Sequence, residues 1–284
     1  MNLLIFGQTG QVARELARRV PKGTTITQLC RAQADLANPE ACAAAILASD
    51  ADAVLNAAAY TAVDRAESDQ AAATMINATT PTAMARACAA EGLPFLHLST
   101  DYVFDGQGKT PFTPDHPTLP INAYGRSKLH GEHGISAAQG QTLILRTSWV
   151  FSAHGNNFLK SMLRLGRERP ALTVVADQIG GPTPASAIAD ALYTCAAAML
   201  NGSRGGIHHF TGSPDTSWAN FARAIMAAAR LPCEITDIPS TAYPTPAQRP
   251  LNSRLDCTSL ARFGIQRPDW RAALPEILHD LEPA

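Results

Sequence analysis

The sequence predicts an α/β protein in which a doubly wound parallel sheet carries a smaller, interleaved C-terminal domain. Apolar runs alternate with helical patterns through residues 1–150, and these runs are apolar throughout rather than at every second residue. Such strands are typical of a parallel sheet that is covered on both faces. Beyond residue 151 the alternation loosens, and residues 238–256 form a long proline-rich loop, which is usually a functional segment in a compact protein.

The expected strands and helices follow one another in order. "NLLIF" runs through a glycine loop into a helix in which Val12, Leu16 and Val20 recur every four residues, and Asn38 with Pro39 opens the next helix. The expected strands are residues 2–6, 24–30, 53–59, 94–100 and 142–151. Further helices are expected at residues 40–49, 78–91, 122–138, 217–231 and 270–281.

These elements divide the chain into two expected domains. The first comprises residues 1–150 plus about 172–200, with the strand–helix order of a Rossmann-type domain that binds NAD or NADP. The second comprises about 151–171 and 201–284 and is expected to bind the substrate. A chain of 284 residues is long enough for one large or two modest domains.

The composition excludes several classes of function. The net charge is −1 and no basic stripe is present, so nucleic acid is not an expected partner. No run reaches the ~18 apolar residues that a membrane span needs. The N-terminus lacks the basic start of a signal peptide, and the six cysteines include no C-x-x-C pair. We therefore expect a cytoplasmic protein with reduced cysteines.

A glycine loop joins the first expected strand to the first helix. Gly7 permits a tight turn, Gly10 lets the backbone approach a pyrophosphate, and Ala13 is small enough for the helix to pack on the sheet. Free N–H groups and the positive dipole at the helix N-terminus favour phosphate. The alternative is a structural turn without a ligand. The pattern predicts a dinucleotide site that contains Gly7, Gln8, Thr9, Gly10, Gln11 and Val12.

The end of the second expected strand distinguishes NAD from NADP. A carboxylate there would bind the 2′-hydroxyl of NAD, whereas this chain has Cys30-Arg31 and no acidic residue until Asp35. The guanidinium of Arg31 matches the geometry of the 2′-phosphate of NADP. We therefore expect NADPH, with NADH as the alternative cofactor and a solvated surface charge as the alternative interpretation of Arg31.

Polar side chains follow the fourth expected strand, where ligands bind in open α/β sheets. They are Ser99, Thr100 and Asp101, and the next helix places Tyr124 and Lys128 one turn apart on one face. A carbonyl that accepts hydride needs a proton donor. We expect Tyr124 to be that donor, Lys128 to lower its pKa and hold the nicotinamide ribose, and Thr100 to bond the substrate oxygen. Taken singly, these residues are more often a strand-end cap and a helix-surface pair.

The motifs around these residues resemble the extended short-chain dehydrogenase/reductase family. They are "FGQTGQVA", "NAAAYTAVDRAES", "STDYVFDG", "AYGRSKLHGE", "LRTSWVF", "GNNF", "DQIGGPT" and "AYPTPAQRPLNSRLD", and they extend nearly end to end. The last few of these motifs resemble one branch of the family, which reduces the C4 keto group of dTDP-4-dehydro-L-rhamnose. That reaction gives dTDP-L-rhamnose and is the last step of the synthesis of this O-antigen precursor.

The resemblance implies further site residues. Those implied for the cofactor, with Asp35 and Leu36 near the adenine, are Arg31, Asp35, Leu36, Ala58, Ala59, Tyr60, Thr61, Ser99, Tyr124 and Lys128. Those implied for the dTDP-sugar are Thr100, Asp101, Tyr124, Trp149, Asn156 and Arg249. Core packing is the alternative for Trp149, and a bridge from the loop to a carboxylate is the alternative for Arg249.

Two other functions are compatible with the same fold. An epimerase or dehydratase of this superfamily would recycle its cofactor, but a dehydratase would usually need an acid pair beside Thr100, and Asp101 is followed by Tyr102. A non-catalytic NADP-binding regulatory subunit would have lost part of the catalytic set, which is intact here.

The resemblance also bears on metal binding and assembly. Some members bind Mg²⁺ between subunits, and Glu15 matches one ligand, but Ser186 stands where another carboxylate would be. This difference argues against a magnesium site. His130 and His133 have no evident third ligand and are interpreted as surface residues, so no metal is expected. The expected assembly is a monomer or a homodimer.

Overall fold

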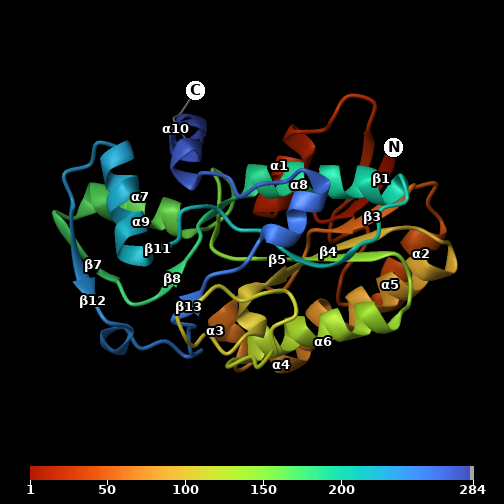
Figure 1. Cartoon of the computed structure of the whole chain (residues 1–284), viewed down its shortest axis with the longest axis horizontal. Helices are drawn as coiled ribbons and strands as arrows, with labels where there is room; N and C mark the ends of the chain where they lie inside the picture. Colours follow the sequence, from red (N-terminus) through yellow and green to blue (C-terminus); the bar gives the residue numbers. More distant parts are fainter. Residues whose placement is uncertain (282–284) are drawn as a thin grey trace.

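A parallel sheet of six strands forms the centre of the computed structural model, which describes residues 1–281 (Figure 1). Its strands are β1 (Asn2–Phe6), β2 (Thr25–Leu29), β3 (Ala53–Asn56), β4 (Phe95–Thr100), β5 (Thr142–Thr147) and β10 (Gly206–His209). They lie in the order β10-β5-β4-β3-β1-β2, and each neighbouring pair is parallel. Since β2 and β3 lie on opposite sides of β1, a crevice is expected beyond the carboxyl ends of β1 and β3.

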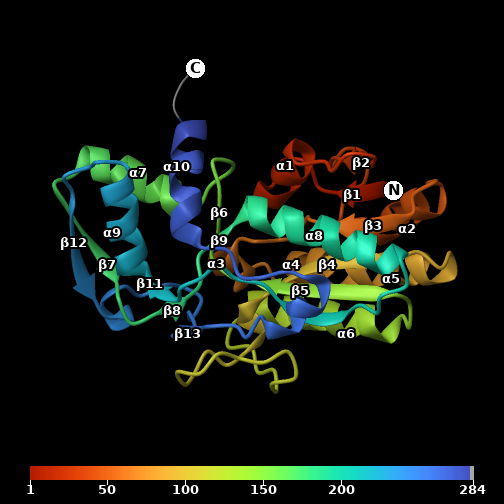
Figure 2. The ribbon, with the colours of Figure 1, turned by 45° about the horizontal axis from the view of Figure 1, so that its top comes forward.

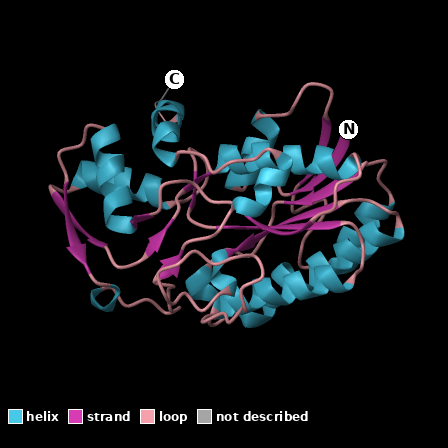
Figure 3. Cartoon of the chain, in the orientation of Figure 1, coloured by secondary structure: helices cyan, strands magenta, loops and turns pink. Residues whose placement is uncertain are grey.

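Helices cover both faces of this sheet (Figure 3). Leu3 and Ile5 of β1 pack towards one face, whereas Leu4 and Phe6 pack towards the other, and all four are buried. Burial of each such side chain contributes about 1.5–3 kcal/mol. The first face is covered by α1 (Gln11–Arg18) and α8 (Ala185–Leu200), and the second by α2 (Pro39–Leu47), α5 (Thr80–Ala90) and α6 (Ala123–Ala137). The predicted doubly wound α/β fold is confirmed.

A smaller layer lies at one end of the main sheet (Figures 1 and 2). Its core contains Phe151, Phe221 and Trp270, which are almost fully buried. The layer is built from α7 (Phe158–Glu168), α9 (Trp218–Ala228) and α10 (Trp270–Asp280) beside the parallel pair β7 (Ala171–Val175) and β12 (Glu234–Ile238).

Short strands and turns connect the two parts. The short strands are β6 (Val150–Phe151), β8 (Ile179–Gly180), β9 (Thr183–Pro184), β11 (Thr216–Ser217) and β13 (Asn252–Ser253). The short helices and turns are α3 (Val63–Ala66), α4 (Gln70–Thr74), the π-helical turn η1 (Met75–Thr79), η2 (Asp101–Val103), η3 (Ser240–Ala242) and η4 (Thr258–Phe263). Within residues 1–281, no helix is long and apolar enough to cross a membrane.

The strand expected at residues 142–151 is broken in the structure. β5 ends at Thr147, and β6 begins at Val150. The break occurs because Trp149 has a φ of 50°, which lies in the left-handed region and cannot continue a strand. The break turns the indole of Trp149 out of the sheet and into the cavity described below.

Two strands lie on the other side of the expected domain boundaries. β10 falls within residues 201–284, yet it joins the main sheet beside β5. β7 falls mostly within the range of about 172–200 assigned to the first domain, yet it pairs with β12 in the smaller layer. The two-domain division is therefore retained as a proposal, with β10 on the cofactor side and β7 on the substrate side.

Candidate active site

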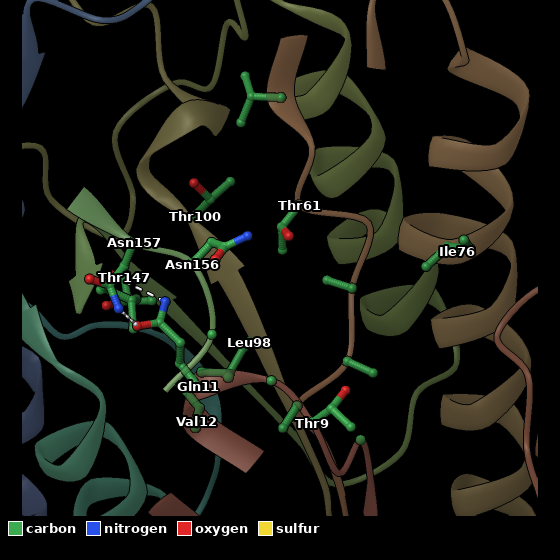
Figure 4. Close-up of a pocket in the computed structure, with 18 of the residues that line it drawn as sticks. Thr9, Gln11, Val12, Thr61, Ile76, Leu98, Thr100, Thr147, Asn156 and Asn157 are labelled. Atoms are coloured by element: carbon green, nitrogen blue, oxygen red, sulfur yellow. Dashed lines mark hydrogen bonds between the residues drawn. The ribbon is translucent and has the colours of Figure 1, made fainter. Parts of the chain in front are cut away.

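A cavity of about 1450 Å³ lies beyond the carboxyl ends of the main strands, between the sheet and the smaller layer. Segments that follow β1, β3, β4 and β5 line it, and Phe158 and Trp218 close it from the smaller layer. Figure 4 shows Thr9 near one end, Gln11 beside Asn156 and Asn157, and Thr100 further along. Of the residues predicted to bind cofactor or substrate, Tyr60 is the one that does not line this cavity.

The glycine loop has the geometry that the sequence predicts. Gly7 has a φ of 114°, and a Cβ there would lie 3.3 Å from the backbone of Ala57 and Ala58, so a larger residue would be both strained and crowded. No side chain caps α1, which leaves the first N–H groups of that helix open to the cavity. This arrangement fits a pyrophosphate at the start of α1.

The side chain of Gln11 is occupied by protein partners. Its Nε2 donates to the carbonyl of Val150 at 3.3 Å, and its Oε1 accepts from Ser152 and Asn157, both at 2.9 Å (Figure 4). The side chain therefore ties the glycine loop to the segment after β6. The part of Gln11 that remains for a phosphate is its backbone N–H.

The adenine end of the cavity contains Arg31, Asp35 and Leu36. The side chain of Arg31 is 82% exposed, and its Nε donates to Asp35 at 3.0 Å. The N–H of Ala37 and the Arg31 side chain lower the pKa of Asp35. Arg31 is thus accessible to a 2′-phosphate, and its present partner is an exposed ion pair worth at most about 1 kcal/mol.

Tyr60 is turned away from the cavity. Its backbone N–H donates to Oδ1 of Asn77 at 2.9 Å, and its hydroxyl donates to Asp69 at 3.2 Å. Its ring packs against Ala66 and Ala73. The neighbouring Ala59 and Thr61 do line the cavity, as predicted.

Thr100, Tyr124 and Lys128 meet on one wall of the cavity. Thr100 ends β4. Asn122 caps α6 by accepting from Gly125 N–H at 2.8 Å, so the helix begins at Ala123, one residue before Tyr124. The structure does not show the expected effect of Lys128 on Tyr124. Burial raises the pKa of Tyr124, the Thr100 hydroxyl opposes this change, and the Asp101 charge adds to it. Tyr124 therefore keeps its proton.

The hydrogen-bond partners of the Lys128 amine lie on β4. Its Nζ lies 3.0 Å from Nε2 of His97 and donates to the carbonyl of Leu98 at 2.7 Å. Lys128 is 1% exposed. Burial lowers the pKa of Lys128 to about 8, against an opposing effect of Glu132. Its charge therefore changes close to neutral pH.

Buried polar atoms without partners line the cavity near Thr100. Asp101 accepts from the Thr100 hydroxyl at 3.1 Å through Oδ1. Its Oδ2 and the Oγ of Ser253 make no well-formed hydrogen bond among the described residues, although Ser253 is near enough to lower the pKa of Asp101. Burial raises the pKa of Asp101 to about 7. Oγ1 of Thr147, at the end of β5, also has no partner within residues 1–281. Such groups are suited to a polar ligand, because leaving them unpaired is unfavourable.

Trp149 forms part of an aromatic wall. Its ring stacks on Trp218 with centroids 3.6 Å apart and an angle of 13°, and Trp218 in turn meets Phe158 at 4.5 Å. A Cβ at Gly180 would lie 2.9 Å from the Trp149 ring, so the glycine is needed for this position. Trp149 both packs and faces the cavity. Trp218 and Phe158 were not predicted as site residues: Trp218 lies outside the quoted motifs, and Phe158 ends the motif "GNNF", of which only Asn156 was assigned to the site.

Arg249 reaches the cavity while bound to a carboxylate. Its Nη2 donates to Asp64 of α3 at 2.7 Å, and Asp64 also accepts from Ala247 N–H at 3.1 Å. Nη1 of Arg249 is buried without a hydrogen bond in the described part of the chain. The bridge therefore holds the proline-rich loop on α3 and leaves one guanidinium nitrogen for a ligand. Asp64 was not predicted.

Glu15 is not part of a metal cluster in the described residues. Its Oε1 lies 3.2 Å from Nε2 of His154 and 3.6 Å from Arg18. No group of three or more potential metal ligands occurs within residues 1–281. His130 and His133 are exposed on α6.

Known proteins resemble the chain over its full length. A family model described as RmlD substrate binding domain matches residues 1–282. The dTDP-4-dehydrorhamnose reductase of Burkholderia thailandensis is 45% identical, and the alignment covers 99% of each chain. Crystal structures of dTDP-4-dehydrorhamnose reductases from Clostridium acetobutylicum and, in complex with NADP, from Bacillus anthracis give TM-scores of 0.92 and 0.91. Their identities are 32% and 30%, and each alignment covers 99% of both chains.

Proposed function

The chain belongs to the RmlD substrate binding domain family, and on that premise we propose that it reduces dTDP-4-dehydro-L-rhamnose at C4 with NADPH to give dTDP-L-rhamnose. The observation that carries this proposal is the position of the Tyr124 phenol beside the Thr100 hydroxyl, in a cavity with an open helix N-terminus at its other end. One end suits a dinucleotide phosphate and the other suits a reacting carbonyl.

The residues of the glycine loop fit NADPH. The close approach of Gly7 to Ala57 and Ala58 leaves the start of α1 open for the pyrophosphate, and Arg31 is accessible for the 2′-phosphate. The Bacillus anthracis relative, crystallised in complex with NADP, supports this choice of cofactor. When bound, the dihydronicotinamide supplies the hydride.

Tyr124 would donate the proton that the reduced C4 oxygen requires. A phenol with a raised pKa is protonated at neutral pH and gives up its proton only when a stronger base, such as a developing alkoxide, is next to it. The Thr100 hydroxyl would bond the same oxygen and the phenol. An ammonium at Lys128 would stabilise the tyrosinate that remains. These roles use the protein for position and charge, as expected when a cofactor carries the redox chemistry.

The other wall of the cavity would hold the sugar nucleotide. The Trp149 indole offers a flat apolar surface for a deoxysugar, with Asp101 and Asn156 as polar partners. Nη1 of Arg249 would bond the diphosphate while Nη2 stays on Asp64. We propose that the enzyme acts in the cytoplasm as a monomer or homodimer.

The decisive assay mixes the purified protein with dTDP-4-dehydro-L-rhamnose and NADPH and follows the loss of NADPH absorbance. We expect turnover and formation of dTDP-L-rhamnose, with NADPH preferred over NADH in kcat/KM. A folded sample that binds NADPH but does not turn over this sugar nucleotide would overturn the proposal. A mixture without the sugar nucleotide controls for slow oxidation of the cofactor.

A further inference from the structure

A chain of three hydrogen bonds runs from the edge of the cavity into the core and ends at Lys128. The N–H of Ala58 donates to Oδ1 of Asn56 at 3.1 Å. Nδ2 of Asn56 lies 3.2 Å from Nδ1 of His97, and Nε2 of His97 lies 3.0 Å from Nζ of Lys128. Asn56, His97 and Lys128 are 0%, 1% and 1% exposed, so water does not supply alternative partners.

Elementary hydrogen-bond chemistry assigns the protons along this chain. A backbone N–H can only donate, so Asn56 must turn Oδ1 to Ala58 and Nδ2 to His97. Nδ1 of His97 then accepts, and a neutral imidazole that accepts at Nδ1 carries its proton on Nε2. Burial lowers the pKa of His97 well below its ordinary value and by itself keeps the ring neutral, and any positive charge on Lys128 would lower that pKa further.

The last link decides the charge of Lys128. The Nε2–H of His97 needs an acceptor, and Nζ has a lone pair only when it is a neutral amine. If Lys128 were an ammonium, this series of hydrogen bonds would have a donor at each end, the Ala58 N–H and Nζ. The Asn56 amide and a neutral His97 ring between them cannot accept from both donors. One of the three contacts would then bring two N–H groups together.

The other groups packed around Lys128 do not impose this preference. Leu98 O accepts from Nζ in either form. Glu132, one turn along α6, favours the ammonium form of Lys128. Its carboxylate is already bound by Arg146 of β5 at 2.6 Å and accepts from Ser99 of β4 at 2.5 Å, which weakens this effect. Tyr124 and Asp101 line the same cavity as Lys128, and burial raises the pKa of each.

We propose that Asn56 and His97 are positioning residues that act through Lys128, and that their buried chain to the Ala58 N–H favours the neutral amine at Nζ in the free enzyme. The charge of Lys128 then depends on what occupies the cavity. Hydroxyls or phosphates of a bound dinucleotide, and a tyrosinate at Tyr124, are the groups that would favour the ammonium. This inference rests on the proposed catalytic role of Lys128.

Asn56→Asp tests this series of hydrogen bonds, because it replaces the side-chain NH₂ group of Asn56 with an oxygen. A carboxylate accepts both from Ala58 and from a protonated Nδ1 of His97, so Nε2 is left to accept from an ammonium at Lys128. We expect the pKa of Lys128 to rise by at least about one pH unit. The alkaline limb of kcat/KM is expected to move upward by the same amount.

The pKa of Lys128 can be read directly by NMR of the full-length protein without ligand. The lysines of the sequence are only Lys22, Lys109, Lys128 and Lys160, so the side-chain ¹³C signal of Lys128 can be assigned with a Lys128→Met variant. Asn77→Asp is the matched control, since Asn77 is equally buried and bonds α6 at Ser127 rather than at His97. An equal rise in both variants would show a general charge effect and overturn the proposal.

The wild-type protein provides a second test that does not depend on a variant folding. Above pH 8, the ¹⁵N spectrum of His97 should show a bare Nδ1 and a protonated Nε2, and Asn56→Asp should reverse this tautomer. A wild-type His97 that carries its proton on Nδ1 would overturn the proposal. These readouts need no turnover, so they are independent of whether the proposed substrate is correct.

Discussion

Tyr124 is the single residue on which the proposed chemistry depends most directly. Its pKa is raised by burial, so at neutral pH it carries the proton that a reduced carbonyl needs. Tyr124→Phe removes only the hydroxyl, and we expect kcat to fall by about 10²–10⁴-fold. NADPH binding, measured by fluorescence titration, should stay within a factor of about two because the glycine loop is untouched. Wild-type turnover by this variant would exclude the phenol as the proton donor.

The predictability of the site differs from residue to residue. The position of the glycine loop, Thr100 and the Tyr124–Lys128 pair at the cavity was predictable because each lies in a short motif close to a strand end. Trp218 was not predictable because packing of a distant element brings it to the cavity, and Asp64, although it lies in a quoted motif, is marked only by its contact with the distant Arg249. Tyr60 was predicted to border the cofactor, but its hydrogen bonds to Asn77 and Asp69 turn it away, and nothing in its local motif indicates them.

At the scale of elements, the contact between α6 and η1 positions the catalytic residues. Gly131 lies on α6, three residues after Lys128, and a Cβ there would collide with the carbonyl oxygen of Asn77 in η1. The backbone of η1 cannot move aside easily, since Asn77 also bonds Tyr60 and Ser127. The absence of a side chain at Gly131 thus allows α6 to lie close to η1 and places Tyr124 against β4.

Gly131→Ala should therefore destabilise the protein, although glycine to alanine in an exposed helix stabilises by about 1 kcal/mol. We expect a loss of about 1–3 kcal/mol in the free energy of unfolding, because α6 must shift. Urea unfolding measures this loss, and kcat should fall with it. Ser136→Ala, at an exposed position of the same helix, is the control. A stabilised Gly131→Ala variant would contradict the packing described.

The strands were predictable in proportion to how apolar they are. β1 and β4 matched because their buried residues are nearly continuous in sequence, and β3 matched except that it ends at Asn56 rather than at residue 59. β2 is exposed or half-buried throughout and was found by its place in the strand–helix order. β10 was not predicted because "GIHH" contains His208 and His209, polar residues that the fold nonetheless buries against Ser259 and Phe112. The break at Trp149 was also missed, since a tryptophan with positive φ has no sequence signal.

At the scale of the whole molecule, stability should depend on pH through Asp101. Its folded pKa is about 7, above the ordinary value of 3.8. Near pH 3 Asp101 is protonated in both the folded and the unfolded state, so it has no effect on how the free energy of unfolding depends on pH. As the pH rises towards 7, the unfolded chain ionises first, so Asp101 increasingly destabilises the folded state, and the full penalty is reached above pH 7.

Asp101→Asn removes this penalty. We expect the variant to gain more stability over the wild type at pH 8 than at pH 4, as measured by urea unfolding at both values. The exposed Asp50→Asn variant is the control and should behave alike at the two pH values. A gain at pH 4 equal to that at pH 8 would show that Asp101 is not buried as the structure describes. Activity should fall in Asp101→Asn, since a substrate partner is lost.

The position of β10 has a consequence for how the protein is made. β5 ends at Thr147, but β10, the strand that pairs with its outer edge, is formed by Gly206–His209. α8, which covers one face of the sheet, spans Ala185–Leu200 and is also synthesised after β5. At about 5–20 residues per second, a ribosome needs about 3–12 s to add these residues. During that interval the nascent chain presents one bare sheet edge and an apolar face that includes Leu3, Ile5 and Leu143. Newly emerging chains are therefore open to chaperones and to mispairing in those seconds, and residues 1–150 cannot be excised as a free-standing dinucleotide module.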